Sequence, residues 1–318
     1  IRNNVMQAKA ATAELAALGE PAIPALQQLL EDKDPLHHQW AVMGFLQIGT
    51  ERANRLAIEQ LEQGHPEARK VAAWYARSSK SDKVRKALVA RLDDEKNPGV
   101  MFWVLRAITE SGPKRFPDLG DKFPAFLRGG DEKLQVLAVN GLVAWKPEGW
   151  LDMLVAQADR ETKPGVIVKL LDTYAGLKQA SEKVAPKIRA ALDHQSRTIR
   201  LKAAVAYRQL GPDDVSTVLL GRLKVEDDPK VKAGLLALVK KTGDRRTEVI
   251  DQLVNALKDD DPKVQMYAVA ILRAYTGKSF GYSPSGTPEE KAKALEAWTT
   301  WWTGARKTWK PKPAPQAP

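Results

Sequence analysis

A repeat of 31 to 34 residues constrains the fold of this 318-residue chain more than any other feature. A residue followed by proline recurs along the chain, and Glu132 and Arg197 fill two gaps in the series. The markers are Asp34-Pro35, His65-Pro66, Asn97-Pro98, Lys163-Pro164, Asp228-Pro229 and Asp261-Pro262. Because a fixed period of this size means stacked supersecondary units, the sequence predicts a solenoid or a related array.

Each marker predicts the start of an α-helix, since Asp or Asn caps a helix and proline fits its first turn. Apolar residues then recur at three- and four-residue steps, as Val231 and Leu235 do. The helices are expected to end at glycines such as Gly211 and Gly243. A second amphipathic helix follows, and no segment shows sustained period-two alternation. We therefore expect an all-α fold, an α-solenoid of about nine antiparallel helix pairs.

The segment 19–26, Gly-Glu-Pro-Ala-Ile-Pro-Ala-Leu, is followed by a charged stretch and Asp34-Pro35. This pattern resembles the bacterial HEAT-repeat family of the phycobilisome-lyase type, and the repeats that begin at Asp228 and Asp261 match its helix-start pattern best. The resemblance covers residues 1 to about 275, and the third to fifth repeats depart from it most. It implies a right-handed superhelix that serves mostly as a binding scaffold, with a few enzymatic offshoots.

A final helix is predicted over residues 287–304, because Thr287 and Glu290 form a capping box. Its tryptophans resemble the C-terminal caps of secreted bacterial HEAT proteins, and a cap shields the open end of a stack. We expect one solenoid domain over residues 1–304, followed by a basic, proline-rich tail over 305–318 with an extended polyproline-like conformation. The predicted apolar stripe of the cap helix is Leu295, Trp298, Trp301, Trp302 and Ala305.

Several classes of chemistry find no support in the sequence. The chain has no Cys, which excludes disulfides and thiolate-held metals, and its four His include no i, i+4 pair. Gly277-Lys278-Ser279 lacks the upstream glycine of a phosphate loop, because Leu272 stands there, so Gly277 is expected to cap a helix. The carboxylates gather at the turns, where capping and solubility explain them. We therefore expect no catalytic residue, no cofactor, no metal and no membrane span.

The tryptophans differ in their repeat positions. Trp40, Trp103 and Trp145 are expected in the core, because their repeat positions are otherwise occupied by aliphatic residues and by Tyr267. The position of Trp74 is occupied elsewhere by residues of mixed polarity, which predicts partial exposure and makes Trp74 a candidate contact aromatic. Packing against the next repeat is the alternative. Trp309, which follows the cap helix, is expected to be exposed.

The net charge of +11 is unevenly distributed. Residues 65–96 and 305–318 each carry +4, whereas 1–64 and 131–162 each carry −3. A basic cluster can contact an acidic partner or phosphates, although a solvated face is the ordinary interpretation. The candidate partner-binding residues are Trp74, Arg69, Lys70, Arg77, Lys83, Arg85 and Lys86 in the third repeat, and Trp309, Lys310 and Lys312 at the C-terminus.

These features favour a non-enzymatic interaction scaffold that binds a partner protein, or serves as a subunit of a complex, through a concave surface lined by the second helices. The alternatives are a HEAT-like nucleic-acid-binding protein, an alkylpurine DNA glycosylase-like enzyme and a bilin-lyase-like enzyme. Mixed charge argues against nucleic acid as the main partner. The chain starts at Ile1, which together with the Trp-rich cap and the tail favours a periplasmic or secreted bacterial protein.

Overall fold

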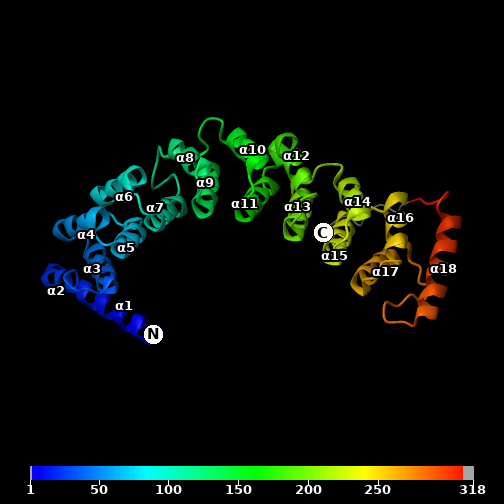
Figure 1. The fold of residues 1–318 in the computed structure, drawn as a ribbon, viewed down its shortest axis with the longest axis horizontal. Helices are drawn as coiled ribbons and strands as arrows, with labels where there is room; N and C mark the ends of the chain where they lie inside the picture. The colour runs from blue at the N-terminus through cyan, green and yellow to red at the C-terminus, as the bar shows by residue number, and fades with distance from the viewer. Residues whose placement is uncertain (1, 311–318) are drawn as a thin grey trace. The chain divides into compact units, whose positions relative to one another are not determined.

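The computed structural model describes the backbone of residues 2–310 and the side chains of residues 6–34 and 37–310. Every regular element in this part of the chain is helical, which confirms the predicted all-α class (Figure 1). The chain divides into two compact units, residues 1–157 and residues 158–318. The prediction for the end of the tail, including Lys312, lies outside the described residues.

The first unit consists of helices in antiparallel pairs, with two short 3-10 turns, and its last helix continues past residue 157 into the second unit. Their bounds are α1 (Arg2–Ala17), η1 (Glu20–Ala22), α2 (Ile23–Gln28), α3 (Pro35–Ile48), α4 (Glu51–Gln63), α5 (Pro66–Ala76), α6 (Asp82–Asp94), α7 (Pro98–Ser111), η2 (Gly120–Lys122), α8 (Phe123–Arg128), α9 (Glu132–Trp145) and α10 (Trp150–Arg160). The helix-start markers of the sequence coincide with the first residues of α3, α5, α7 and α9.

The second unit continues the same pattern and ends with a longer helix. Its bounds are α11 (Pro164–Ala175), η3 (Lys178–Ala180), α12 (Ser181–Ala191), α13 (Arg197–Leu210), α14 (Val215–Val225), α15 (Pro229–Thr242), α16 (Thr247–Ala256), α17 (Pro262–Thr276) and α18 (Pro288–Ala305). We call α3, α5, α7, α9, α11, α13, α15 and α17 the marker helices. The helix that follows each marker helix is called its second helix.

Local chemistry at the helix ends agrees with the sequence predictions. The Asp228 carboxylate accepts the backbone N–H groups of Lys230 and Val231 at 2.9 and 3.1 Å, which caps α15. The last turn of α13 is closed by Gly211 at φ 77°, a left-handed conformation that glycine adopts without a Cβ clash. These two ends are set by residues within a few positions of each other, which is why the sequence alone predicts them.

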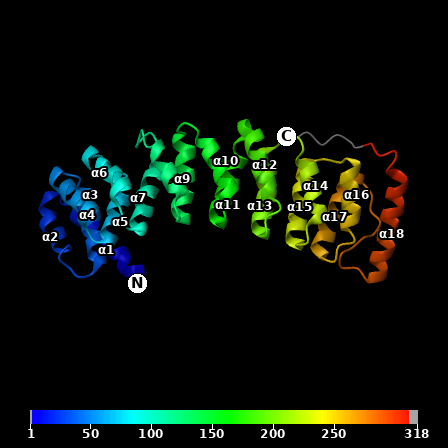
Figure 2. The ribbon, with the colours of Figure 1, turned by 45° about the horizontal axis from the view of Figure 1, so that its top comes forward.

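The marker helices form the inner layer of each unit. Neighbouring marker helices pack against one another extensively, whereas neighbouring second helices make fewer contacts, so each unit curves with its marker helices inside (Figures 1 and 2). Small residues allow this close approach, such as Ala72 and Ala73 in α5 and Ala203 and Ala204 in α13, all buried. The expectation that second helices line the concave surface was therefore wrong.

A buried carboxylate joins two successive repeats in the second unit. The Glu226 side chain is fully buried and accepts hydrogen bonds from Arg200 at 2.7 and 2.8 Å and from Arg222 at 2.8 and 3.0 Å. It also accepts the backbone N–H of Asp228 at 3.0 Å. Burial alone would raise the pKa of Glu226, but the hydrogen bonds from Arg200, Asp228 and Arg222 lower it to about 2. This arrangement fixes the turn that precedes α15.

The first unit contains the same arrangement at the same spacing. Glu95 accepts from Arg69 at 3.0 Å and from Arg91 at 2.8 Å, and it also accepts the N–H of Asn97 at 2.8 Å. Burial would raise the pKa of Glu95, and these hydrogen bonds lower it to about 2. A carboxylate that sequence reasoning assigned to capping and solubility is therefore a buried link between repeats.

The last helix covers one side of α16. Trp298 and Trp302 are buried, and the Trp302 indole donates to the Asp251 carboxylate at 2.7 Å. Arg306 also contacts Asp251 at 2.9 Å, and hydrogen bonds from Arg306 lower the pKa of that carboxyl. The predicted capping box between Thr287 and Glu290 is present. Among the described residues, no helix is long and apolar enough to cross a bilayer.

Candidate interaction surface

A pair of tryptophans lies on the inner layer of the first unit. The rings of Trp74 in α5 and Trp103 in α7 make an edge-to-face contact, with centroids 5.5 Å apart and planes at 77°. Both side chains are half-buried, and Phe102 makes a second edge-to-face contact with Trp103 at 5.7 Å. The predicted partial exposure of Trp74 is confirmed, and Trp74 also packs against the next repeat. Trp103 is half-buried, although it was predicted to lie in the core.

Two guanidinium groups lie against these rings. Arg77 Cζ is 3.7 Å from the Trp74 centroid, and Arg106 Cζ lies 5.0 Å from Trp74 and 5.2 Å from Trp103. These distances are typical of cation–π contacts. Arg106 also donates to Glu110 at 2.7 Å. We call Trp74, Trp103, Arg77 and Arg106 the aromatic–arginine cluster.

The repeat fold does not require a tryptophan at this position. The equivalent of Trp74 is the buried Met43 in α3, the half-buried Asn140 in α9 and the exposed Asp172 in α11. Side chains this different are compatible with the same helix packing. The two indoles of the cluster are therefore a local feature of α5 and α7.

The other two tryptophans predicted in the core, Trp40 and Trp145, are also half-buried. Trp145 has a structural role, because its indole donates to the Phe116 carbonyl at 2.8 Å and its ring lies 4.9 Å from that of Phe123. A tryptophan is large enough to bury most of its ring while one edge stays accessible. This explains why repeat position alone overestimates its burial.

Most of the predicted basic cluster in the third repeat is neutralised by neighbouring carboxylates. Arg69 is held by the buried Glu95, as described above. The remaining ion pairs join Lys70 to Glu67 at 2.6 Å, Lys83 to Glu51 at 3.0 Å, and Arg85 to Asp82. Lys86 is exposed, with no ion pair recorded within the described residues. Four of the six candidate cations of the third repeat therefore have carboxylate partners, and Arg77 lies over the Trp74 ring.

The C-terminal candidates also differ from expectation. Trp309 is half-buried, since its indole donates to the Arg245 carbonyl at 2.8 Å and its ring makes an edge-to-face contact with Trp302 at 5.6 Å. The expectation that Trp309 is exposed was wrong, because the chain after α18 folds back onto that helix. Lys310 is exposed.

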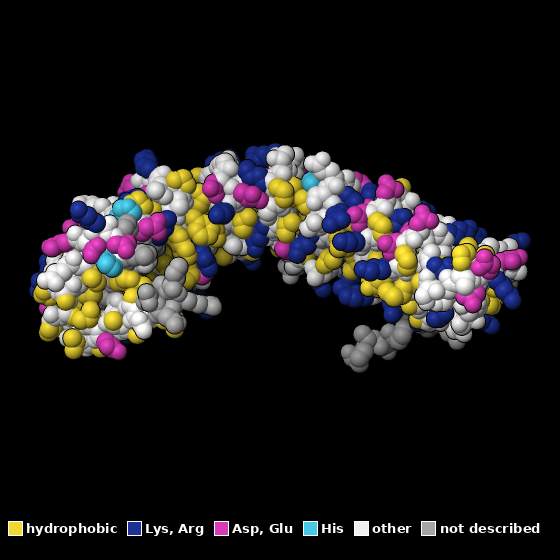
Figure 3. All heavy atoms as spheres, turned by 60° about the horizontal axis from the view of Figure 1, so that its bottom comes forward, with side chains coloured by type: hydrophobic (Ala, Val, Ile, Leu, Met, Phe, Trp, Pro, Cys, Tyr) yellow, Lys and Arg dark blue, Asp and Glu magenta, His cyan; other side chains and the backbone are white. Residues whose placement is uncertain are grey.

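The second unit carries nearly all of the net charge. Residues 158–318 contain 29 Lys and Arg against 19 Asp and Glu, whereas residues 1–157 contain 21 against 20. Marker helices α13, α15 and α17 contain four, four and two Lys or Arg residues, and none of the three contains an Asp or Glu. Lys and Arg side chains gather around exposed hydrophobic ones on this unit (Figure 3). The sequence did not predict this concentration of Lys and Arg on the inner helices, because charge counted over consecutive residues mixes the inner and outer helices.

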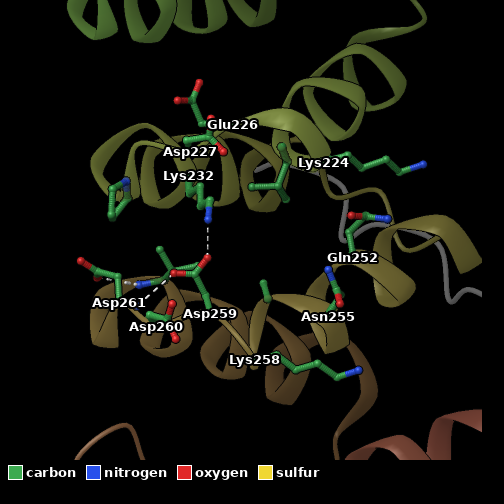
Figure 4. A pocket seen from close by; sticks show the side chains of 14 residues that line it. Lys224, Glu226, Asp227, Lys232, Gln252, Asn255, Lys258, Asp259, Asp260 and Asp261 are labelled. Atoms are coloured by element: carbon green, nitrogen blue, oxygen red, sulfur yellow. Dashed lines mark hydrogen bonds and ion pairs between the residues drawn. The ribbon is translucent and has the colours of Figure 1, made fainter.

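A cavity of 450 Å³ lies among α14, α15, α16 and α17 (Figure 4). Its carboxylates have structural partners: Glu226 binds two arginines, Asp259 pairs with Lys232 at 2.6 Å, and Asp261 caps α17. The side chains of Lys224 and Lys258 extend away from these carboxylates (Figure 4). Among the described residues, no group of three or more His, Cys, Asp or Glu could hold a metal ion.

Comparisons with known proteins give weak likenesses. No family model matches the chain, and no curated protein matches it. A chain of the complex of CpcE and CpcF of phycocyanin lyase from Nostoc is 18% identical, with 78% of this chain and 94% of that chain covered and a TM-score of 0.40. Human deoxyhypusine hydroxylase is 14% identical, with 87% and 100% covered and a TM-score of 0.34. The helix pairs themselves establish the fold, an all-α solenoid.

Proposed function

We propose that the protein is a non-enzymatic scaffold that binds a partner protein through the inner, marker-helix surface of its units. The observation that supports this most is the aromatic–arginine cluster of α5 and α7. The residues that dominate the energetics of protein interfaces are enriched in Trp and Arg. An indole buries a large area with only two rotatable bonds, and a guanidinium forms several directed hydrogen bonds. A scaffold also needs a long surface of packed helices, which the repeats supply.

The cluster is suited to a partner because its indoles are already oriented. Trp74 and Trp103 contact each other edge to face, and the Arg77 guanidinium lies over the face of the Trp74 ring. A preorganised contact loses less conformational entropy on binding than a free side chain does. The half-buried rings leave an apolar edge that a partner would cover.

Site-specific photo-crosslinking in the cells that make the protein tests this proposal. A benzoylphenylalanine at Phe102 replaces a half-buried inner residue, and one at Ala90 serves as an exposed control on α6. We expect a discrete adduct from position 102 alone, and we expect Trp74→Ala to abolish it. No adduct at position 102, or the same adducts from both positions, would contradict the proposal.

One observation favours a second function, nucleic-acid chemistry. Arg106 holds the Glu110 carboxylate at 2.7 Å beside the rings of Trp74 and Trp103, which brings a carboxylate, a cation and stacking surfaces together. A base taken out of a duplex is bound by such groups. Excision assays on alkylated duplexes with Glu110→Gln as the control test this function, and it is refuted if no base is released by the unmodified chain.

A further inference from the structure

The exposed side of α13, α15 and α17 forms a second surface, separate from the aromatic–arginine cluster. Positions two, six, nine and thirteen after each N-cap share one side of a helix, because successive residues turn by about 100°. In α15 these positions hold Lys230, Gly234, Ala237 and Lys241. The middle positions of α17 likewise hold Tyr267 and Ala270, whereas those of α13 hold Val205 and Lys202, which pairs with Asp172.

An apolar floor runs across the middle of these helices. Its residues are Val205 from α13, Gly234 and Ala237 from α15, and Tyr267 and Ala270 from α17, and none of them is fully buried. Tyr267 is 37% exposed. A Cβ at Gly234 would lie 2.4 Å from Leu201 Cδ1, so glycine permits α13 and α15 to pack closely and keeps the floor flat.

Three lysines flank this floor, two on one rim and one on the other. Lys230 and Lys263 lie at the start of α15 and α17, and Lys241 lies at the end of α15. Eleven residues separate Lys230 from Lys241, about 16 Å along the helix axis. All three lysines are exposed, and no ion pair is recorded for them within the described residues. We call these lysines and the floor between them the lysine-rimmed face.

Other lysines of the same unit do have carboxylate partners. Lys202 contacts Asp172 at 2.8 Å, and Lys232 contacts Asp259 at 2.6 Å. Carboxylates of neighbouring segments therefore pair with some lysines of these helices. Lys230 and Lys263 follow the N-cap residues Asp228 and Asp261 by two positions, but those carboxylates accept backbone N–H groups of α15 and α17. The ammonium groups of Lys230, Lys241 and Lys263 are therefore accessible to an acidic partner.

We propose that the lysine-rimmed face binds an acidic amphipathic α-helix of a partner protein, which lies across α13, α15 and α17. This inference rests on the proposed scaffold function and names the class of its partner. A helix about 10 to 12 Å wide fits between rims about 16 Å apart. Its apolar stripe covers Tyr267 and the alanines, and acidic residues on both flanks reach the lysines.

The apolar floor favours an amphipathic helix over a nucleic acid as the ligand of this face. A duplex carries phosphates on both sides of its grooves, but it has no apolar stripe that would cover Tyr267, Ala237 and Ala270. An amphipathic helix matches both the charged rims and the apolar strip. Marker helices about 10 Å apart give a floor that a helix of about 16 residues would span.

The test is fluorescence anisotropy with the full chain and a labelled 16-residue peptide, with leucines on one helical face and glutamates on both flanks. The reference probes are a scrambled peptide of the same composition and a 16-base-pair DNA duplex. The variant Lys230→Glu/Lys241→Glu/Lys263→Glu should weaken peptide binding at least about tenfold, since each reversal replaces an attraction by a repulsion. Tyr267→Ala should weaken it about fivefold without changing its salt dependence.

The matched control is Lys178→Glu/Lys224→Glu/Lys258→Glu, which changes the net charge equally with exposed lysines outside the marker helices. We expect this control to retain binding within about twofold. Equal loss in the control, equal binding of the scrambled peptide, or no peptide binding at low salt would overturn the proposal. Tighter binding of the duplex, lost in the rim variant, would overturn it in favour of a nucleic acid.

The two proposals fail separately. Trp74→Ala should abolish the crosslink at position 102 and leave peptide binding unchanged, because α5 and α7 belong to the other unit. If the crosslink is absent but the peptide binds as described, the partner site of the first unit is wrong and the lysine-rimmed face stands. If the crosslink forms but the peptide does not bind, only the present inference is wrong.

Discussion

The buried carboxylate Glu226 offers the sharpest test of how the repeats are held together. Glu226→Gln keeps the shape of the side chain but removes the charge that Arg200 and Arg222 contact. A pKa lowered from 4.5 to about 2 corresponds to about 3 kcal/mol of stability at neutral pH. The substitution leaves two arginines near an uncharged amide, and losses of about 3 kcal/mol are typical when a buried pair is broken.

The pH dependence of this contribution has a definite sign. Because the pKa of Glu226 is lower in the folded chain than in the unfolded one, its stabilisation is complete above the unfolded pKa of 4.5. It decreases as the pH falls toward 2, and about half of it is lost by pH 3. The unmodified chain should therefore lose more stability between pH 7 and pH 3 than Glu226→Gln does.

Urea unfolding followed by circular dichroism at 222 nm, at pH 7 and pH 3, measures both effects. Because repeat arrays can unfold in steps, amide hydrogen exchange in α14 and α15 shows whether the loss of stability is confined to these helices. Asp227→Asn is the matched control, since that side chain lies next to Glu226 and is exposed. If Glu226→Gln and Asp227→Asn have the same unfolding midpoints at both pH values, the account of the buried link is refuted.

Three further predictions concern the packing of helices. Gly141→Ala should destabilise the chain by about 1 to 3 kcal/mol in urea unfolding, because its Cβ would lie 2.2 Å from the Phe123 ring. Its control is Gly221→Ala, whose Cβ would meet no atom within 4 Å and which should stabilise α14 by up to about 1 kcal/mol. Equal effects would contradict this. Asp251→Ala should cost about 1 to 3 kcal/mol and speed hydrogen exchange in α18, because it removes the partner of Trp302 and Arg306; unchanged exchange would contradict that role. Asp261→Ala should weaken α17 by about 1 kcal/mol through loss of its N-cap, seen as faster exchange in its first turn; exchange like that of the unmodified chain would refute it.

The local features of the fold could be predicted from the sequence, because they depend on residues close together in the chain. The cap at Asp228, the left-handed Gly211 and the capping box of Thr287 each involve a few adjacent positions. Repetition of these signals also predicted the helix pairs. The sequence pattern therefore carried the fold class and the position of most helix starts.

The layer that lies inside each unit could not be predicted in this way. It depends on how closely neighbouring helices approach, which is decided by small residues such as Ala72 and Ala203 across separate repeats. The ion pairs of the third repeat could not be predicted either, because Arg69 contacts Glu95 and Lys83 contacts Glu51 from separate helices. The concentration of Lys and Arg in α13, α15 and α17 likewise depends on which helices share the inner layer.

The central claim, that the marker-helix surface binds the partner, is tested most directly by hydroxyl-radical footprinting of the native complex against the free chain. Trp74 and Tyr267 lie on the marker helices of the two units, and Val225, 63% exposed on α14, reports on a second helix. We predict that oxidation of Trp74 and Tyr267 falls several-fold in the complex while that of Val225 is unchanged. Protection of Val225 with no protection of Trp74 or Tyr267 would contradict the account.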